Sequence, residues 1–315
     1  FPYVNGGLFS NDKRLEIPQF TEELKQMILA KASDDFDWSE ISPTIFGAVF
    51  ESTLNPETRR SGGMHYTSIE NIHKVIDPLF LDTLKAEFEE IKGISQEKQQ
   101  RQRLDAFQDK LASLTFFDPA CGSGNFLTES YVSLRRLENQ VIALRNKGQA
   151  VIGDFANPVK VDIHQFYGIE INDFAVSVAT TALWIAEQQM LQETEKIASF
   201  QIKSLPLKAY HNIKEGNALR IDWSEVIAPE KLNYIMGNPP FVGLSLRTTA
   251  QQEDMDLIFK GNDRAGRLDY VAAWYRKAAD YMPNTKIEAA FVRANSIYQG
   301  EQVPILWEEL FQKGI

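Results

Sequence analysis

The chain has 315 residues, of which 43% are hydrophobic and 11% aromatic, so it can bury a core in one large domain or two modest ones. Its 33 Lys and Arg against 43 Asp and Glu give a net charge of -10, which argues against a complete DNA-binding protein, since a surface that grips a polyanion is normally basic. One cysteine and four histidines without paired spacing predict no disulfide and no metal site, and the lack of a signal segment or long apolar run favours the cytoplasm without a membrane.

Residues 1–112 are predicted to form a helical N-terminal region that caps the rest of the chain. Ser42 followed by Pro43 is typical of a helix start, and apolar pairs follow at helical spacing. The segment Thr67-Ser68-Ile69-Glu70 has the form of a capping box, with Thr67 as the N-cap of a second helix. Residues 83–113, rich in Lys, Glu, Gln and Arg, predict a long solvated helix or a helical pair.

From residue 113 to 315, strands alternate with helices. The predicted strands are LTFFD at 114–118, FYGIEI at 166–171, a third near 209–213, YIMG at 234–237 and AAFVRAN at 289–295. The predicted helices begin near Phe126, run from about Asn172 to Gln192, and pass through LDYVAAWYRKAADYM at 268–282. This order predicts an α/β fold with a doubly wound, mostly parallel sheet, in which ligands bind at the carboxyl ends of the strands.

The loops after the first two strands carry chemical groups suited to a ligand. In Asp118-Pro119-Ala120-Cys121-Gly122-Ser123-Gly124-Asn125-Phe126, the glycines allow close backbone approach and Asp118 offers an acceptor to a cationic group; a plain strand-to-helix turn is the alternative. The missing third glycine of G-x-G-x-x-G disfavours a hydride-transfer enzyme. Glu170 can accept both hydroxyls of a ribose, or can be a solvated strand end.

The loops after the third and fourth strands point to an amine substrate. In Gly216-Asn217-Ala218-Leu219, the Asn217 amide can pair with an adenine edge, with a surface turn as the alternative. Asn238-Pro239-Pro240-Phe241 lacks two backbone N–H groups, so the Asn238 side-chain oxygen and the Pro239 carbonyl can hold the two N–H groups of an amine. Phe241 would stack on a flipped base; an ordinary Asn-Pro turn is the alternative.

The combination of these motifs resembles a known family. DPACGSGNFL, the Glu of GIEI, and NPPF resemble the methyl-donor and catalytic motifs of class I adenine-N6 DNA methyltransferases. GGMHYTS at 62–68 resembles their remaining cofactor motif, and its N-terminal placement marks the gamma arrangement. The resemblance implies a Rossmann-like methyltransferase fold and S-adenosylmethionine as the cofactor. It implies catalytic residues Asn238, Pro239, Pro240 and Phe241, and cofactor-binding residues Tyr66, Thr67, Asp118, Ala120, Gly122, Gly124, Asn125, Glu170, Ile171, Asn217 and Ala218.

Further segments are similar to the fused bacterial or archaeal restriction-modification enzymes of type IIG, especially the subgroup called type IIL. They are FPYVNGGLF, FGAVFESTL, GGMHYTSIENIHKVIDPLFLDTL, LDYVAAWY and NSIYQGEQVPILW. The similarity implies a nuclease domain before this region and a DNA-recognition domain after it. The chain is therefore expected to be a methyltransferase-domain fragment, with a catalytic core at 113–315 that lacks the last two strands of the sheet.

Two residues depart from the pattern of that family, and the reading has alternatives. Asn217 stands where an Asp is often found, and Ser68 where many relatives have Pro. The same fold and NPP loop also suit methylation of cytosine N4 or of a protein glutamine. The acidic charge and the missing partner domains leave a catalytically silent cofactor-binding fragment as the third possibility.

Overall fold

The computed structural model describes residues 19–31, 35, 41–53, 67–146, 158–198, 210–262, 264–293 and 295–313. Near the N-terminus it contains helices α1 (Glu22–Leu29) and α2 (Pro43–Thr53). Ser42 precedes α2, and its Oγ accepts a hydrogen bond from the Ile45 N–H at 3.4 Å. The predicted helix start at Ser42 and Pro43 is therefore confirmed.

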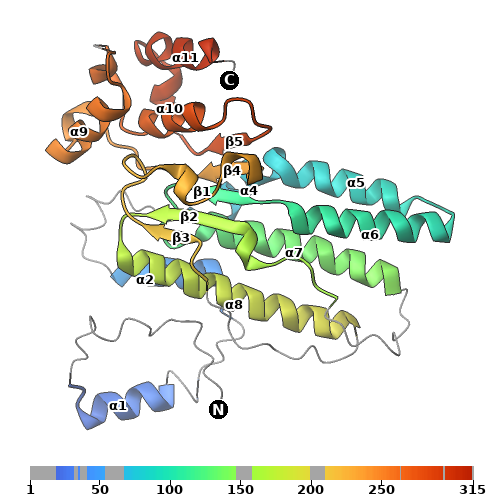
Figure 1. Ribbon diagram of the computed structural model, residues 1–315. Helices are drawn as coiled ribbons and strands as arrows, with labels where there is room; N and C mark the ends of the chain where they lie inside the picture. Colours follow the sequence, from blue (N-terminus) through green and yellow to red (C-terminus); the bar gives the residue numbers. More distant parts are fainter. Residues whose placement is uncertain are drawn as a thin grey trace.

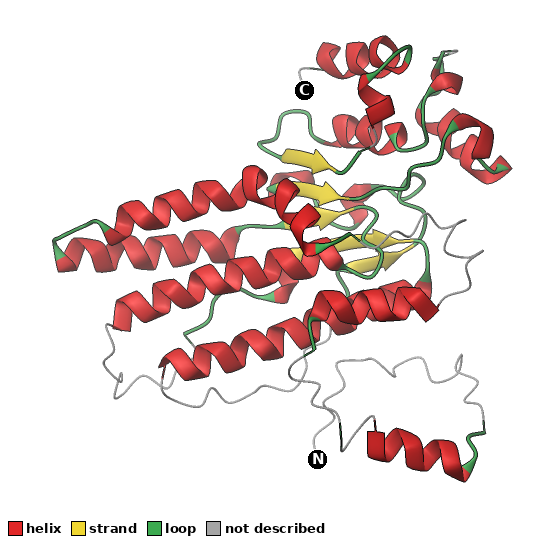
Figure 2. Cartoon of the chain, turned by 180° about the vertical axis from the view of Figure 1, so that it is seen from behind, coloured by secondary structure: helices red, strands yellow, loops and turns green. Residues whose placement is uncertain are grey.

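Five parallel strands form one sheet, as the alternation of strands and helices predicts. The strands are β1 (Phe116–Asp118), β2 (Phe166–Glu170), β3 (Ile213–Glu215), β4 (Tyr234–Gly237) and β5 (Glu288–Phe291). Their order across the sheet is β3-β2-β1-β4-β5, and each neighbouring pair is parallel. The strand arrows point the same way in Figure 2. The third strand, predicted near 209–213, lies later in the chain. β3 pairs with β2 so that Ile213 lies opposite Gly168 and Glu215 opposite Glu170.

The helices over residues 69–113 directly precede β1, and the pair over residues 82–113 extends to the right in Figure 1. In chain order they are α4 (Ile69–Ile76), the π-helical segment η4 (Asp77–Leu81), α5 (Asp82–Lys92) and α6 (Glu97–Ser113). The predicted helical pair over 83–113 is confirmed, with buried Leu and Phe side chains between two polar outer faces. The domain boundary between 112 and 113 stays a prediction.

Helices cover both faces of the sheet. The helices after β1 are α7 (Asn125–Asn146), α8 (Asp173–Ala198), α9 (Thr249–Ile258), α10 (Ala272–Tyr281) and α11 (Gln302–Gln312). Short turns of 3-10 helix are η5 (Ile163–Gln165), η6 (Trp223–Glu225), η7 (Pro229–Lys231), η8 (Leu244–Leu246), η9 (Ala265–Arg267) and η10 (Asn295–Tyr298). Figure 1 shows α7 and α8 on the opposite side of the sheet from α10 and α11. The doubly wound architecture is confirmed.

Alternate residues of a strand contribute to two different hydrophobic cores, because successive side chains of a strand point to opposite faces of the sheet. Phe116 faces the core made by the helices from α4 to α8, and its ring stacks on that of Phe166 with centroids 4.9 Å apart. Its neighbour Phe117 faces the second core, which contains Trp223 and side chains of α10 and α11. Within the described part of the chain, no helix is long and apolar enough to cross a membrane.

Candidate active site

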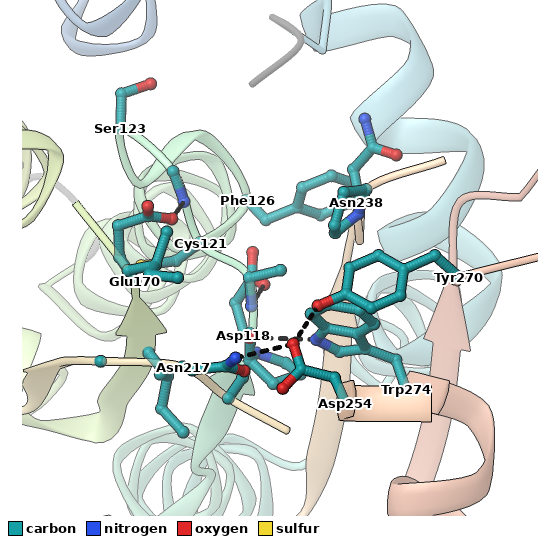
Figure 3. A pocket seen from close by; sticks show the side chains of 18 of the residues that line it. Asp118, Cys121, Ser123, Phe126, Glu170, Asn217, Asn238, Asp254, Tyr270 and Trp274 are labelled. Atoms are coloured by element: carbon teal, nitrogen blue, oxygen red, sulfur yellow. Dashed lines mark hydrogen bonds between the residues drawn. The ribbon is translucent and has the colours of Figure 1, made fainter. Parts of the chain in front are cut away.

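A cavity of about 310 Å³ opens at the carboxyl ends of the strands, where the fold predicts a ligand. Loops after β1, β2, β3 and β4 all contribute to its wall, and Figure 3 shows their side chains converging on it. The predicted site residues that line it are Thr67, Asp118, Ala120, Gly122, Asn125, Glu170, Ile171, Asn217, Ala218, Asn238 and Pro240. Motifs from Thr67 to Pro240 are thus brought together in one place.

Asp118 ends β1 at the floor of the cavity and is 1% exposed. Its Oδ1 accepts a hydrogen bond from the Ala120 N–H at 2.9 Å. Burial, helped by the negative charge of Glu170 and opposed by that hydrogen bond, raises the pKa of Asp118 to about 8. A positively charged ligand beside this carboxyl group would favour its ionised form and so lower its pKa.

Glu170 ends β2 and joins the loops on either side of it. Its Oε2 accepts from the Gly122 N–H at 2.9 Å, and its Oε1 accepts from the Asn172 N–H at 3.0 Å. These bonds fix the position of the carboxylate at the cavity wall. Ile171, which follows it, lines the cavity while 60% exposed, so it offers an apolar surface at the mouth.

Gly124 does not line the cavity but makes its loop possible. The residue has φ +81, in the region that favours glycine, and the Gly124 N–H donates to the Cys121 carbonyl at 2.8 Å. A Cβ at this position would lie 2.8 Å from the Cβ of Ala179 on α8. The turn therefore packs directly on α8 and starts α7 at Asn125.

Asn217 lines the cavity after β3, and both halves of its amide already have one partner. Its Oδ1 accepts from the Leu219 N–H at 2.9 Å, and its Nδ2 donates to Asp254 Oδ2 at 2.9 Å. The oxygen is therefore turned toward its own loop and the NH₂ group toward α9. This orientation was not expected from the sequence, because Asp254 is 37 residues away along the chain.

Asn238 follows β4 and is held by a residue from the distant N-terminal region. Its Nδ2 donates to Thr67 Oγ1 at 3.0 Å. Its Oδ1 is buried and has no hydrogen-bond partner in the part of the chain that the structure describes. Since buried oxygens are normally paired, this lone acceptor at the cavity wall suits a ligand N–H.

The structure corrects the predicted capping box at Thr67. The N-cap of α4 is Ser68, whose side chain accepts from the Asn71 N–H, and the helix begins at Ile69. The one-residue shift releases the Thr67 hydroxyl from capping, which leaves it available to Asn238. Thr67 thus belongs to the cavity, and Ser68 supplies the cap that the sequence assigns to Thr67.

Besides Gly124, two predicted site residues do not line the cavity, and one falls outside the described residues. Phe241 is half-buried against the second hydrophobic core rather than in the cavity wall, and Pro239 also lies outside the set of lining residues. Tyr66 falls outside the described residues, as does most of the 62–68 motif. The roles of these residues stay predictions.

Sequence reasoning missed one wall of the cavity. It is made by α9 and α10, with Thr248, Ala250, Gln251, Asp254, Tyr270 and Trp274 as lining residues. The Thr248 and Gln251 side chains form a capping box, a signal that was available in the sequence and predicts α9. Tyr270 and Trp274 have the spacing of core aromatics, and only the packing of α10 brings them to the cavity.

The cavity has a marked charge preference. Three buried carboxyl groups line it, those of Asp118, Glu170 and Asp254. None of the described residues that line it is Lys, Arg or His. A phosphate-bearing nucleotide would find no cation there, whereas a positively charged ligand would relieve the mutual repulsion of the carboxylates.

Comparison with known proteins identifies the family of the chain. Residues 94–315 match the family described as MmeI, DNA-methyltransferase domain, which is more than half of the chain. The chain belongs to this DNA-methyltransferase domain family. The resemblance to type IIL restriction-modification enzymes is thereby confirmed, as is the Rossmann-like methyltransferase fold.

Two known proteins and one solved structure match over nearly all of the chain. DNA methyltransferase A of Bacillus subtilis (strain 168) is 39% identical over 327 residues, which are 100% of this chain and 35% of that protein. A putative type II restriction enzyme and methyltransferase of Methanocaldococcus jannaschii is 23% identical, over 99% of this chain and 30% of that protein. The solved structure of the type IIL restriction-modification enzyme MmeI in complex with DNA has a TM-score of 0.90 at 43% identity, and covers 100% of this chain and 41% of that one. The chain thus spans well under half the length of these relatives.

Proposed function

We propose that this domain transfers a methyl group from S-adenosylmethionine to the N6 amine of adenine in DNA, in the cytoplasm of a bacterium or archaeon. The observation that carries the proposal is the combination of groups at one cavity: it is lined by Asn238, whose buried Oδ1 has no partner among the described residues, and by three buried carboxyl groups. The first feature suits an amine that must be held, and the second suits a cationic methyl donor.

The residues of the cavity fit S-adenosylmethionine. Bound there, this cofactor would supply an electrophilic methyl group on a sulfonium sulfur. Asp118 would accept from its ammonium group and lose its proton in doing so, and Glu170 would accept from the ribose hydroxyls. Ile171 would cover one face of the adenine ring, and Asn217 and Ala218 would lie along its edge.

Asn238 and Pro239 would prepare the target nitrogen. The exocyclic nitrogen of adenine is a weak nucleophile, because its lone pair is conjugated with the ring. The Asn238 oxygen and the Pro239 carbonyl would each accept one of its N–H groups, which favours a pyramidal nitrogen and stabilises the positive charge that develops on it. Because Thr67 holds the other end of the Asn238 amide at 3.0 Å, the oxygen is already positioned before the base arrives.

The target atom cannot be reached inside a duplex, so the base must leave the helix. The chain itself carries a net charge of -10, which makes strong DNA binding by this region alone unfavourable. MmeI was solved in complex with DNA, and the domain covers 41% of it. We infer that a recognition domain elsewhere in the protein delivers the DNA, and that the same protein carries a nuclease domain.

A direct assay tests the proposed function. The full-length protein is incubated with S-adenosylmethionine carrying a labelled methyl group and with DNA, and the modified nucleosides are identified by mass spectrometry. We expect N6-methyladenine, and we expect the Asn238→Ala variant to lose activity by about 100- to 1000-fold while its cofactor Kd changes less than about threefold.

The other outcomes of this assay separate the alternatives. N4-methylcytosine or methylated protein glutamine would reassign the substrate while leaving the cofactor site intact. Cofactor binding without methylation of any of the three substrates would identify a silent binding domain. Failure to bind S-adenosylmethionine would overturn the proposal as a whole.

A further inference from the structure

Asp254 is a buried carboxylate that the proposed reaction does not yet use. It lies on α9, is 2% exposed and lines the cavity beside Asn217. Three donors hold it: Asn217 Nδ2 at 2.9 Å, Arg220 Nε at 2.6 Å and the Tyr270 hydroxyl at 2.7 Å. Figure 3 shows its side chain between those of Asn217 and Tyr270. A carboxylate offers about four acceptor positions, so one position remains for a ligand.

The hydrogen bonds keep this group ionised. Burial alone favours the neutral acid, but the bonds from Tyr270, Arg220 and Asn217 outweigh burial and lower the pKa of Asp254. Asp254 therefore has no proton to donate, and it can only accept a hydrogen bond from whatever lies beside it.

The neighbouring polar side chains are committed to other partners. The Asn217 oxygen accepts from the Leu219 N–H, so it is turned back to its own loop. Thr248 and Gln251 bond each other's backbone in the capping box of α9. Asp254 is thus the acceptor that this end of the cavity presents to a ligand.

We propose that Asp254 accepts a hydrogen bond from the exocyclic amine of the cofactor's adenine and makes the site selective for adenine over an oxo purine. The assignment rests on the proposed function, because it places the adenine of S-adenosylmethionine beside Asn217. An amine at this position donates to the carboxylate. An oxo group at this position places its oxygen against the carboxylate oxygen of Asp254. Both are acceptors without a proton between them, so such a ligand binds more weakly.

The test compares two ligands that differ in this one group. Titration calorimetry on the full-length protein measures S-adenosylhomocysteine and its deaminated analogue, S-inosylhomocysteine. We expect the wild-type protein to prefer the adenine ligand by about 10- to 100-fold. Asp254→Asn can turn an N–H toward the oxo group, so the preference should fall below about threefold or reverse.

One control variant separates recognition from folding. Glu253→Gln removes a carboxylate from the adjacent position of α9, one that also bonds Arg220, at 3.1 Å, but lies outside the cavity lining. This variant should keep the wild-type preference for adenine.

Each contrary result has its own meaning. Equal affinity of the wild-type protein for the two ligands overturns the assignment, whether or not the Asp254→Asn variant folds. A folded Asp254→Asn protein with the full adenine preference overturns it too. If the wild-type protein binds neither ligand, the proposed function itself is overturned, and the assignment with it.

Discussion

Thr67 and Asn238 are 171 residues apart in the sequence and share a hydrogen bond of 3.0 Å at the cavity wall. Thr67→Val keeps the shape of the side chain and removes the acceptor, so the Asn238 amide loses the contact that orients it. We expect kcat to fall by about tenfold in a steady-state methylation assay. Thr67→Ser retains the hydroxyl and should keep most of the activity. A Thr67→Val enzyme with unchanged kcat would contradict the orienting role.

Asp118 links the ionisation of one residue to the stability of the fold. The unfolded chain loses this proton near pH 3.8, whereas the folded chain retains it up to about 8. Between these values the unfolded state is favoured increasingly as the pH rises. Asp118→Asn mimics the protonated acid, so at pH 7 it should raise the free energy of unfolding by as much as about 4 kcal/mol.

Denaturant titrations at pH 5 and pH 7 measure this effect, and the gain from Asp118→Asn should be larger at pH 7. Asp256→Asn, at an exposed position on α9, is the control and should show little change at either pH. Calorimetry in two buffers of different ionisation enthalpy should also detect most of a proton released when the wild-type protein binds S-adenosylmethionine at pH 7. The Asp118→Asn variant should release none and should bind the cofactor about 10- to 100-fold more weakly.

At the scale of elements, α2 lies on the cofactor loop. α2 packs against α7 and α8, and a Cβ at Gly47 would come within 2.8 Å of Ser123 Oγ and 3.1 Å of Asn125 Oδ1. We expect Gly47→Ala to push this loop and to raise the cofactor Kd by about tenfold, although alanine favours a helix more than glycine does. Ile45→Ala, at a position of α2 that is 50% exposed, should leave the Kd unchanged. Equal binding by Gly47→Ala and wild type would show that α2 does not shape the loop.

The elements differ in how well the sequence predicts them. The four-residue run YIMG gives β4 correctly, because it is apolar, short and bounded by turn residues. β3 is displaced in the prediction, because hydrogen bonding to β2 rather than hydrophobicity sets its register. Helix α8 continues to Ala198 rather than Gln192, since its polar end has no stop signal.

The residues of the site also differ in how well the sequence predicts them. Residues that directly follow a strand, such as Asp118, Glu170 and Asn238, can be placed at the cavity from the sequence, because parallel strands end at one edge. Asp254 comes from α9 and Tyr270 lies just before α10 begins, and the direction of such side chains depends on how the helices pack. No local pattern contains that information, so the α9 wall and the bond between Asn217 and Asp254 had to come from the structure.

At the scale of the whole molecule, an acidic cavity lies within a chain of net charge -10. We expect S-adenosylmethionine at about 100 times its Kd to stabilise the protein by about 2.7 kcal/mol, as measured by a shift in Tm. ATP and NAD at the same concentration should give no shift, since their phosphates would meet carboxylates without a cation. A comparable shift with either nucleotide would contradict the charge preference of the cavity.

Gly237 allows the loop that would hold the target base to lie directly against the loop that would hold the cofactor. It is the last residue of β4, with φ +152, and a Cβ there would lie 2.3 Å from Asp118 Oδ1. The backbone that leads into Asn238 therefore rests directly on the acid that ends β1. This contact fixes the loops after β1 and β4 relative to each other. The distance between the proposed methyl donor and the proposed acceptor is therefore set by the pairing of the two strands. Any side chain larger than hydrogen at position 237 would therefore displace Asp118 and, with it, the loop that follows β1.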